Sequence, residues 1–283
     1  MSPAQNEEKN NQPQGDNMNM YQEITNLMIE KIKSGIIPWK QPYLSHMNYL
    51  HQKPYRGINR LILSLYNYKS PFWLTFKQIS QLGGKVKKHS KAVKVVFWNI
   101  VEDENQKTYA KCRFYHVFNI EQVEGIEFKL PETKIRAYGV DPLDYLSHHA
   151  YIEEKNGATP CYSPSVDKIF IPEINYFDDE ISYYSVLFHE MVHSTGHSNR
   201  LNREGVNNLA LFDEHTYSFE ELVAEMGASF LNSEFGYKEE TIDRSAAYIA
   251  SWLRVLESNP KYIFQASSKA QEAVDYLLGS LPS

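Results

Sequence analysis

The segment Phe188–His197, FHEMVHSTGH, contains two histidines and a glutamate at the spacing H-E-x-x-H. On a helix, positions i and i+4 stand one turn apart on one face, so His189 and His193 can direct their imidazole nitrogens at a single ion. Glu190 then lies on the adjacent face, beside the open coordination position. Such a zinc ion would acidify a bound water, and Glu190 would take its proton and pass it to the leaving amine of a peptide. The spacing therefore predicts a zinc hydrolase with Glu190 as general base.

A catalytic zinc site uses three protein ligands, so a third ligand has to be found. His197 follows closely, but Gly196 is expected to end the helix just before it. The metzincin pattern H-E-x-x-H-x-x-G-x-x-H would place its third histidine at position 199, where this chain has Asn199. We therefore expect His197 to lie at the helix end as a capping or supporting residue, and we keep it as an alternative ligand.

A glutamate-rich segment at residues 218–228, SFEELVAEMGA, offers a better third ligand. As a helix it has one face of large apolar residues and one of small residues, including Gly227, where another helix can approach closely. Glu221 lies beside the small-residue face and can reach a metal on the histidine helix. Glu225, one turn later, can hydrogen-bond a ligating imidazole. The helical wheel does not exclude Glu220 as the ligand, and a solvated acidic helix is the alternative without a metal.

Hydrophobic periodicity predicts an α+β scaffold for these residues. The expected elements, in chain order, are helices at 20–34, 56–63 and 75–82, a β-hairpin of 92–98 with 112–118, a helix near 142–151, a hairpin of 160–163 with 168–172, and helices at 181–195, 217–232, 239–257 and 265–280. Tyr248 lies in the predicted helix at 239–257. It could polarise a substrate carbonyl; the alternative is that Tyr248 belongs to the hydrophobic core.

Charge is distributed unevenly along the chain, whose net charge is −6. Residues 20–130, the front half, contain 17 Lys and Arg against eight acids; residues 131–283, the back half, contain 11 against 24. Between Lys31 and Val101 there are 13 cations and no acid. This segregation favours an anionic partner for the front half.

The same basic stretch is interleaved with aromatic residues. Phosphates favour Lys and Arg, and unpaired bases stack on flat side chains, whereas a duplex does not expose its base faces. The mixture predicts binding of single-stranded nucleic acid, and docking onto an acidic protein is the alternative. The candidate DNA-binding residues are Lys53, Tyr55, Arg56, Asn59, Arg60, Trp73, Lys85, Lys87, Lys88, Lys91 and Trp98.

The remaining composition narrows the class of protein. Residues 1–19 have almost no large apolar groups, so we expect a disordered tail there. No apolar run approaches the roughly 20 residues needed to span a bilayer, and no secretory signal precedes the fold, which predicts a cytoplasmic protein without a membrane partner. Cys112 and Cys161 are too far apart in sequence for a C-x-x-C ligand pair, so we predict neither a disulfide framework nor a cysteine-rich zinc site.

Several motifs in order along the chain resemble ArdC-type antirestriction proteins, and the likeness runs from about residue 20 to 280. In the front half the motifs are Ile37-Pro-Trp39, Tyr55-Arg-Gly-Ile-Asn59, Trp73-Leu-Thr-Phe76, Val96-Phe-Trp98 and Tyr115-His-Val-Phe-Asn119. In the back half they are Tyr162-Ser-Pro-Ser-Val-Asp-Lys-Ile-Phe-Ile-Pro172, Leu187 to His197, Arg200-Leu201, Phe219-Glu-Glu-Leu-Val-Ala-Glu225 and Ala247-Tyr-Ile-Ala-Ser-Trp252.

The resemblance implies a protein of conjugative plasmids or related mobile elements that binds incoming single strands and shields them from host restriction. It also implies a zincin-like domain whose metal is held by His189, His193 and the glutamate helix, and E-x-x-A-E is similar to the gluzincin motif in which the first acid is the ligand. Where the family usually has tryptophan after H-E-x-x-H, this chain has Ser194, which could alter packing beside the site without removing a ligand.

Together these observations predict two domains in one α+β chain. A tail at 1–19 precedes a basic single-stranded-DNA-binding domain at 20–125, a linker at 126–141 and a zincin-like metallopeptidase domain at 142–283. The expected cofactor is one divalent metal, zinc, with manganese or another ion as the alternative. The expected partners are single-stranded DNA and a host defence protein as peptide substrate. The alternatives are a peptidase whose basic domain docks an acidic protein, and a DNA-binding module with a catalytically silent metal site.

Overall fold

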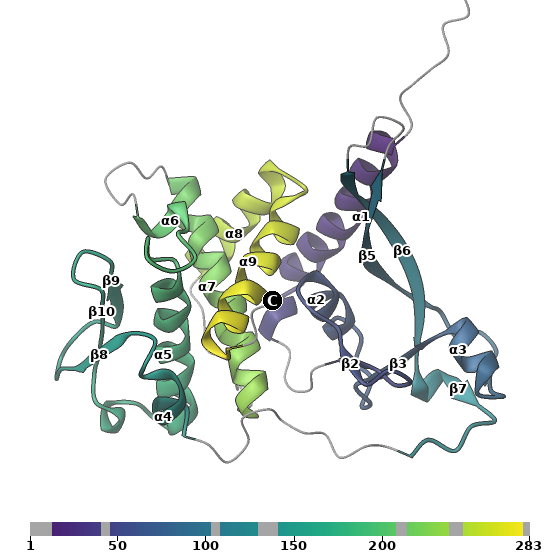
Figure 1. Ribbon diagram of the computed structural model, residues 1–283, viewed down its shortest axis with the longest axis horizontal. Helices are drawn as coiled ribbons and strands as arrows, with labels where there is room; N and C mark the ends of the chain where they lie inside the picture. The colour runs from purple at the N-terminus through teal and green to yellow at the C-terminus, as the bar shows by residue number, and fades with distance from the viewer. Residues whose placement is uncertain are drawn as a thin grey trace, which may run out of the picture.

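The computed structural model describes residues 13–40, 46–102, 108–129, 141–207, 214–237 and 246–279. Its front half is built on a long antiparallel hairpin, which stands beside the first helix in Figure 1. β5 (Val93–Glu102) and β6 (Thr108–Asn119) pair from Val93 with Val117 to Glu102 with Thr108. The hairpin predicted from alternation is therefore confirmed; the turn between its strands lies outside the described residues.

Short strands extend this hairpin into a five-stranded sheet of order β2-β1-β3-β6-β5. The added strands are β1 (Met47–Asn48), β2 (Lys53–Pro54) and β3 (Phe72–Thr75), and a separate pair is formed by β4 (Lys85–Val86) and β7 (Val123–Glu124). β1 runs parallel to β3, and the other pairs of the five-stranded sheet are antiparallel. These strands have only two to four residues each, too few to show an alternating pattern, and were not expected from the sequence.

The front helices pack against the sheet and against the back half. They are α1 (Pro13–Lys33), α2 (Ile58–Ser64) and α3 (Phe76–Gln81), and short 3-10 turns occur at Pro38–Lys40 and Ile120–Gln122. Ile24, Met28 and Ile32, spaced four residues apart, are all buried along one face of α1. α1 begins at Pro13, inside the segment predicted to be a tail, so that boundary was wrong; residues 1–12 lie outside the described part of the chain.

The back half contains a three-stranded sheet followed by packed helices. The elements are α4 (Pro142–Leu146), β8 (Tyr151–Glu154), β9 (Cys161–Ser163), β10 (Lys168–Ile171), a 3-10 turn at Ile174–Tyr176, α5 (Glu180–Thr195), α6 (Glu204–Asn207), α7 (Glu214–Phe235), α8 (Ala246–Ser258) and α9 (Tyr262–Leu277). β10 is central, parallel to β8 and antiparallel to β9, so β9 is an edge strand. The helix predicted near 142–151 is shorter than expected, because Tyr151 already begins β8.

Close contact between α5 and α7 brings the two candidate ligand helices together. A Cβ atom at Gly227 would lie 2.6 Å from Cγ2 of Val192, a distance that packed atoms do not adopt. Ala224 and Ala228 on the same helix are also buried. The small-residue face predicted for residues 218–228 is thus where α5 approaches.

The two halves share one hydrophobic core rather than standing apart. Trp39 packs edge-on against Trp252 with ring centres 5.3 Å apart, and its carbonyl accepts a hydrogen bond from the Ser229 hydroxyl. Buried Arg60 pairs with Glu234 of α7. Figure 1 accordingly places α1 and α2 directly beside α8 and α9. Within the described residues, no helix is both long and apolar enough to cross a membrane.

Candidate metal centre

Two helices with well-defined ends position the candidate ligands. Asp179 begins α5 as its N-cap, where its carboxylate accepts a hydrogen bond of 2.6 Å from the amide of Ser182. Leu187, Phe188, Met191 and Val192 are fully buried and fix the rotation of α5 about its axis. His189 and His193 therefore face α7, whose first turns carry Glu221.

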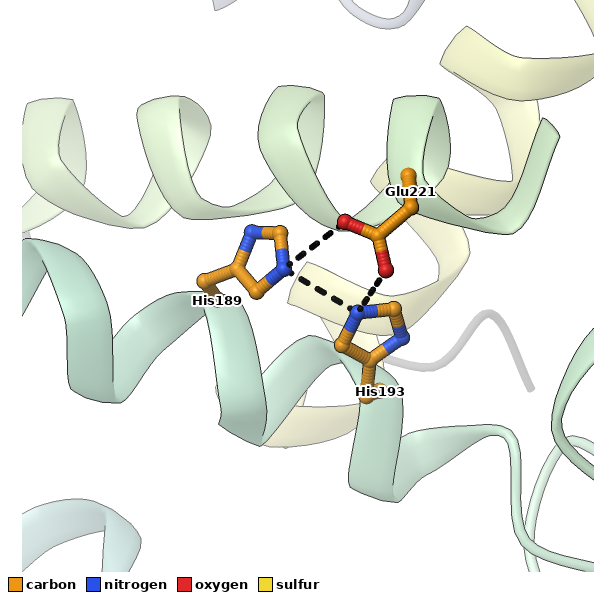
Figure 2. Close-up of side chains that lie close together, drawn as sticks. All are labelled: His189, His193 and Glu221. Carbon is orange, nitrogen blue, oxygen red and sulfur yellow. Dashed lines mark hydrogen bonds and ion pairs between the residues drawn. The ribbon is translucent and has the colours of Figure 1, made fainter. Parts of the chain in front are cut away.

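The three side chains converge on one point between α5 and α7, as Figure 2 shows. The Nε2 atoms of His189 and His193 are 3.1 Å apart. Glu221 places one carboxylate oxygen 3.5 Å from Nε2 of His189 and the other 3.4 Å from Nε2 of His193. Each residue thus offers a donor atom within 4.8 Å of the others.

These separations suit a divalent ion. Ligand atoms bound tetrahedrally to zinc at about 2.0–2.1 Å lie about 3.3–3.4 Å from one another. The distances of 3.5 and 3.4 Å reach the two separate carboxylate oxygens of Glu221, and one donor atom from each of the three residues lies within 4.8 Å of the others, close enough to surround a single ion. Two imidazoles and one carboxylate also form the donor set of many catalytic zinc sites. The residues present therefore fit a metal that keeps one position open.

A second set of carboxylates supports the imidazoles from behind. Glu225 lies 3.5 Å from Nδ1 of His189, and Glu220 lies 3.3 Å from Nδ1 of His193. A carboxylate at Nδ1 fixes the ring orientation and leaves Nε2 free to bind a metal. The structure thus places Glu225 where the sequence predicts it, and it places Glu220, kept above as an alternative ligand, behind a histidine.

Arg203 holds Glu220 in this position. Its guanidinium donates to the Glu220 carboxylate at 2.7 and 3.0 Å, and it donates at 2.7 Å each to the Thr195 hydroxyl and the Val192 carbonyl. Arg203 and Glu220 are both buried, so each charge depends on the other. This arginine was not among the residues predicted from the sequence. Its one signal is that Arg200 and Arg203 are the only cations between Lys168 and Lys238.

The electrostatics follow from this arrangement. Burial lowers the pKa of His193, but the carboxylates of Glu220 and Glu221 raise it, to about 10 overall. Burial also acts to raise the pKa values of both glutamates, yet Arg203 and the histidines hold them below their usual range. Both carboxylates are therefore ionised at neutral pH. A metal bound at Nε2 of His193 would compete with a proton for that atom.

Glu190 lies beside this cluster and faces the edge strand β9. One oxygen of its carboxylate accepts a hydrogen bond of 2.6 Å from the amide of Tyr162. Glu190, His189 and His193 line a cleft of about 310 Å³, and residues 160–162 form part of its wall. The ligands and the predicted general base therefore open into a common cleft.

A tyrosine, an aspartate and an arginine fasten the β9–β10 hairpin to the end of α5. The Tyr162 hydroxyl donates to Asp167 at 2.7 Å, and Arg200 donates to Asp167 at 3.0 Å. Arg200 also donates at 2.7 Å to the Ser194 carbonyl near the end of α5. Ser194 itself is buried, and its hydroxyl donates to the Met191 carbonyl. These contacts fix one wall of the cleft relative to the histidine helix.

Two other predicted residues do not join the ligand group. His197 lies just beyond α5, where its Nδ1 accepts a hydrogen bond from the Asn199 amide at 3.3 Å. Among the described residues, the candidate ligand group contains only His189, His193 and Glu221. The side chain of Tyr248 lies outside the described part of the chain.

The structure divides the predicted DNA-binding residues by exposure. Tyr55 and Asn59 are half-buried, and the amide group of Asn59 makes both a donor and an acceptor bond with the backbone of Val96. The exposed members are Lys53, Arg56, Lys85, Lys87, Lys88, Lys91 and Trp98.

Two of the predicted DNA-binding residues lie in the interior, and that prediction was wrong. Trp73 is fully buried, and its indole donates to His46 at 3.1 Å. Arg60 is buried against Phe230 and paired with Glu234. Neither side chain is positioned to contact single-stranded DNA at the protein surface. Composition could not reveal this, because it does not say which cations and aromatics face inward.

Comparison with known proteins gives matches to both halves. Residues 18–131 match the model of the N-terminal domain of the anti-restriction factor ArdC, and residues 145–269 match that of a zincin-like metallopeptidase. The chain is 30% identical to the uncharacterized protein y4eC of Sinorhizobium fredii (strain NBRC 101917 / NGR234), over 91% of each chain. It is 28% identical to the DNA primase TraC of Escherichia coli, over 90% of this chain but only 19% of the primase. The chain thus spans about a fifth of that primase's length.

Solved structures resemble the whole of the fold. Crystal structures of the antirestriction ArdC protein from the R388 plasmid, one metal-free and one Mn(II)-bound, superpose with a TM-score of 0.79. They are 33% and 34% identical in sequence and match 92% of this chain and 97% of theirs. The similarity therefore covers the arrangement of both halves.

Proposed function

Because the chain belongs to the ArdC family of antirestriction proteins, with an ArdC N-terminal domain followed by a zincin-like domain, we propose that it binds single-stranded DNA and hydrolyses protein at a divalent metal. The observation that carries the enzymatic part is the convergence of His189, His193 and Glu221 beside Glu190. The DNA-binding part rests on the charge and the exposed aromatics of the front half.

The front half offers a surface suited to an unpaired strand. Exposed lysines follow the β4 region at residues 85–91, and Trp98 is exposed on the hairpin. Cations would neutralise phosphates, and flat rings would stack on bases irrespective of sequence. This surface favours single strands over duplexes.

In the back half, His189, His193 and Glu221 would hold the ion, with Glu225 and Glu220 orienting the imidazoles. When bound, the ion supplies a Lewis acid that polarises a carbonyl and acidifies a water. Glu190 accepts the water's proton in the cleft, and the hydrogen bond from the Tyr162 amide keeps its carboxylate oriented. As the water oxygen bonds to the carbonyl carbon and the peptide C–N bond breaks, Glu190 would pass this proton to the leaving amine.

The donor set suits zinc, and the manganese in the R388 ArdC structure makes manganese the second candidate. We expect the purified protein to carry about one divalent ion per chain. Elemental analysis of the wild type beside Glu221→Ala, Glu220→Ala and His197→Ala distinguishes the ligands. Only Glu221→Ala should abolish metal retention; loss in His197→Ala would instead make His197 a ligand.

The DNA-binding part is tested by fluorescence anisotropy with a labelled single strand and a duplex of equal length. We expect tighter binding to the single strand. The logarithm of the affinity should fall linearly with the logarithm of the salt concentration, because releasing condensed counterions is less favourable at high salt. Equal affinity for the duplex, or no binding at low salt, contradicts this part of the proposal.

The biological role that follows is protection of incoming mobile-element DNA, with a host defence protein as the peptide substrate. The chain should raise the transfer of an unmodified plasmid into a restricting host and leave transfer into a restriction-deficient host unchanged. A Glu190→Gln variant in the same assay separates shielding by binding from cleavage of a host protein. Full protection by this variant would favour a binding protein with a silent metal site.

A further inference from the structure

A pocket of about 480 Å³ lies on the seam between the two halves. One wall comes from α1, the start of α2 and β5, and the other from α9 of the back half. The middle of β5 at Trp98, the turn at Gly57 and the length of α9 up to Asp275 meet there. We call it the seam pocket.

Three aromatic side chains form one side of the seam pocket. Tyr21 lies at the centre, with its ring centre 5.9 Å from Trp98 and 4.7 Å from Phe264. Phe264 is buried, but 42% of Trp98 is exposed. A tryptophan left this open beside a pocket offers a free stacking face.

Polar groups with fixed positions form another side. The side-chain Oε1 of Gln271 accepts a hydrogen bond of 3.2 Å from the backbone amide of Gly57. The side-chain Nε2 of Gln271 donates to the Asp275 carboxylate, also at 3.2 Å. Asp275 is buried and paired with Arg56, whose side chain is about half exposed. The side-chain amide and carboxylate held in this way suit the hydrogen-bonding edge of an unpaired base.

A further cation lies at the rim. Lys261 is exposed at the start of α9, and its ammonium group lies 5.7 Å from the centre of the Tyr21 ring. Together with Arg56, it places positive charge on both sides of the pocket. Phosphates on either side of a bound base would meet these two cations.

We propose that the seam pocket binds one unpaired base of a single DNA strand, stacked on Trp98, with its flanking phosphates at Arg56 and Lys261. This inference rests on the proposed DNA binding and extends it, because it assigns part of the DNA site to α9. A duplex cannot present a base face to this pocket. Single-strand binding is then a property of both halves together.

Shared lining residues place the seam pocket and the metal cleft on either side of a third hollow. Gln265 lines both the seam pocket and this third hollow, of about 210 Å³. Gly205 and Glu220 line that hollow and also the metal cleft. A strand leaving the seam pocket along α9 would therefore run toward the metal cleft, and a protein bound near that strand would lie close to Glu190.

The first test compares neighbouring residues on β5. Phe97 and Trp98 are exposed to similar extents, but successive side chains on a strand face opposite sides, and Phe97 contacts Tyr115 instead of Tyr21. Trp98→Ala should weaken binding of a labelled oligo-dT about fivefold or more, as expected for the loss of one stacked base. Phe97→Ala should change it less than twofold. The reverse result overturns the proposal and places the strand on the other face.

The second test reverses a charge on the back half. Lys261→Glu should weaken binding several-fold and reduce the slope of log affinity against log salt by about 0.7, the loss of one phosphate contact. Lys155→Glu, an equal charge change at an exposed site in the loop after β8, is the control. Equal affinities for wild type and Lys261→Glu contradict a role for α9. If the wild type binds no single strand at all, the DNA-binding function itself fails.

Photo-crosslinking gives a readout that does not depend on variants. A 4-thiothymidine oligonucleotide should crosslink to peptides containing Trp98 and residues 261–271. Crosslinks confined to the Phe97 and Tyr115 face or to residues 85–91 overturn the assignment. Competition with thymidine monophosphate distinguishes a free nucleotide from a strand, because a strand site requires the flanking phosphates and should be displaced only weakly by the monomer.

Discussion

The two halves of the molecule differ in how they present their functional groups. In the back half, the ligands, their supporting carboxylates and Arg203 are buried or half-buried and connected by hydrogen bonds and close charged contacts. In the front half, the cations suited to DNA are exposed at the surface. The buried cation Arg60 instead forms an ion pair inside the protein. A metal centre needs fixed geometry, whereas a single DNA strand can be bound by a surface that carries positive charge and exposed aromatic side chains.

The strongest test of this contrast is Glu190→Gln. It should lower peptidase turnover about 100-fold to 10,000-fold, because the general base is lost. Metal content and affinity for single-stranded DNA should not change, since Glu190 is not one of the three candidate ligands and lies in the back half. Assays of hydrolysis, metal content and DNA affinity on the same preparation check all three. A parallel fall in DNA affinity would mean that the two sites are coupled.

The next largest effect is expected in the buried ion pair behind His193. Arg203→Met removes the partner of the buried Glu220 and should lower the free energy of unfolding by about 3–5 kcal/mol. Urea denaturation measures this change. The double variant Arg203→Met/Glu220→Gln should recover most of the loss, because no buried charge is left unpaired. If the double variant is as unstable as the single one, the loss comes from packing and not from charge.

This contrast also explains what the sequence could predict. His189 and His193 follow directly from helical spacing, and Glu221 follows from the small-residue face around Gly227. Arg203 could not be predicted, because its role depends on a loop that returns to α5 and on a carboxylate of another helix. In the front half, Arg60 and Trp73 were assigned to the surface because composition does not distinguish inward from outward side chains.

The fold was predictable to a similar degree. The long β5–β6 hairpin shows clear alternation, and the helices show clear periodicity. The parallel pairs of β1 with β3 and of β8 with β10 join short strands that are distant in sequence. A local pattern does not contain that information, which arises only when the chain has packed.

A front-half arginine tests the corrected assignment. Arg60→Met should lower the free energy of unfolding by about 1–3 kcal/mol, less than Arg203→Met, because its partner Glu234 retains contact with water. The affinity of the folded variant for single-stranded DNA should stay within twofold of wild type. Lys88→Met, which alters an exposed cation, should have the opposite profile, with unchanged stability and weaker binding. Weaker DNA binding by Arg60→Met at unchanged stability would restore Arg60 to the DNA surface.

The smallest effect is expected at the rim of the metal cleft, where Asp167 joins the β9–β10 hairpin to Arg200. The Arg200 hydrogen bond, opposed in part by burial, lowers the pKa of Asp167 to about 2 in the folded chain, below the value of about 3.9 for an unfolded aspartate. The ionised carboxylate therefore stabilises the fold above pH of about 4, and this contribution disappears as the pH falls toward 2. Asp167→Asn should cost less than about 1 kcal/mol at neutral pH, because water screens a side chain that is 39% exposed.

Urea denaturation, from neutral pH down to the lowest pH at which the chain stays folded, measures how much lower the free energy of unfolding of Asp167→Asn is than that of the wild type. We call this difference the stability gap. The gap should be constant at neutral pH and narrow below about pH 4. Asp178→Asn, at an exposed position in the same half, is the matched control. A gap that widens on acidification would mean that Asp167 is held protonated in the fold and that Arg200 does not fix the hairpin through its charge. The edge strand would then depend on the Tyr162 contact with Glu190, and the rim of the cleft would resemble the buried centre more than the exposed front half.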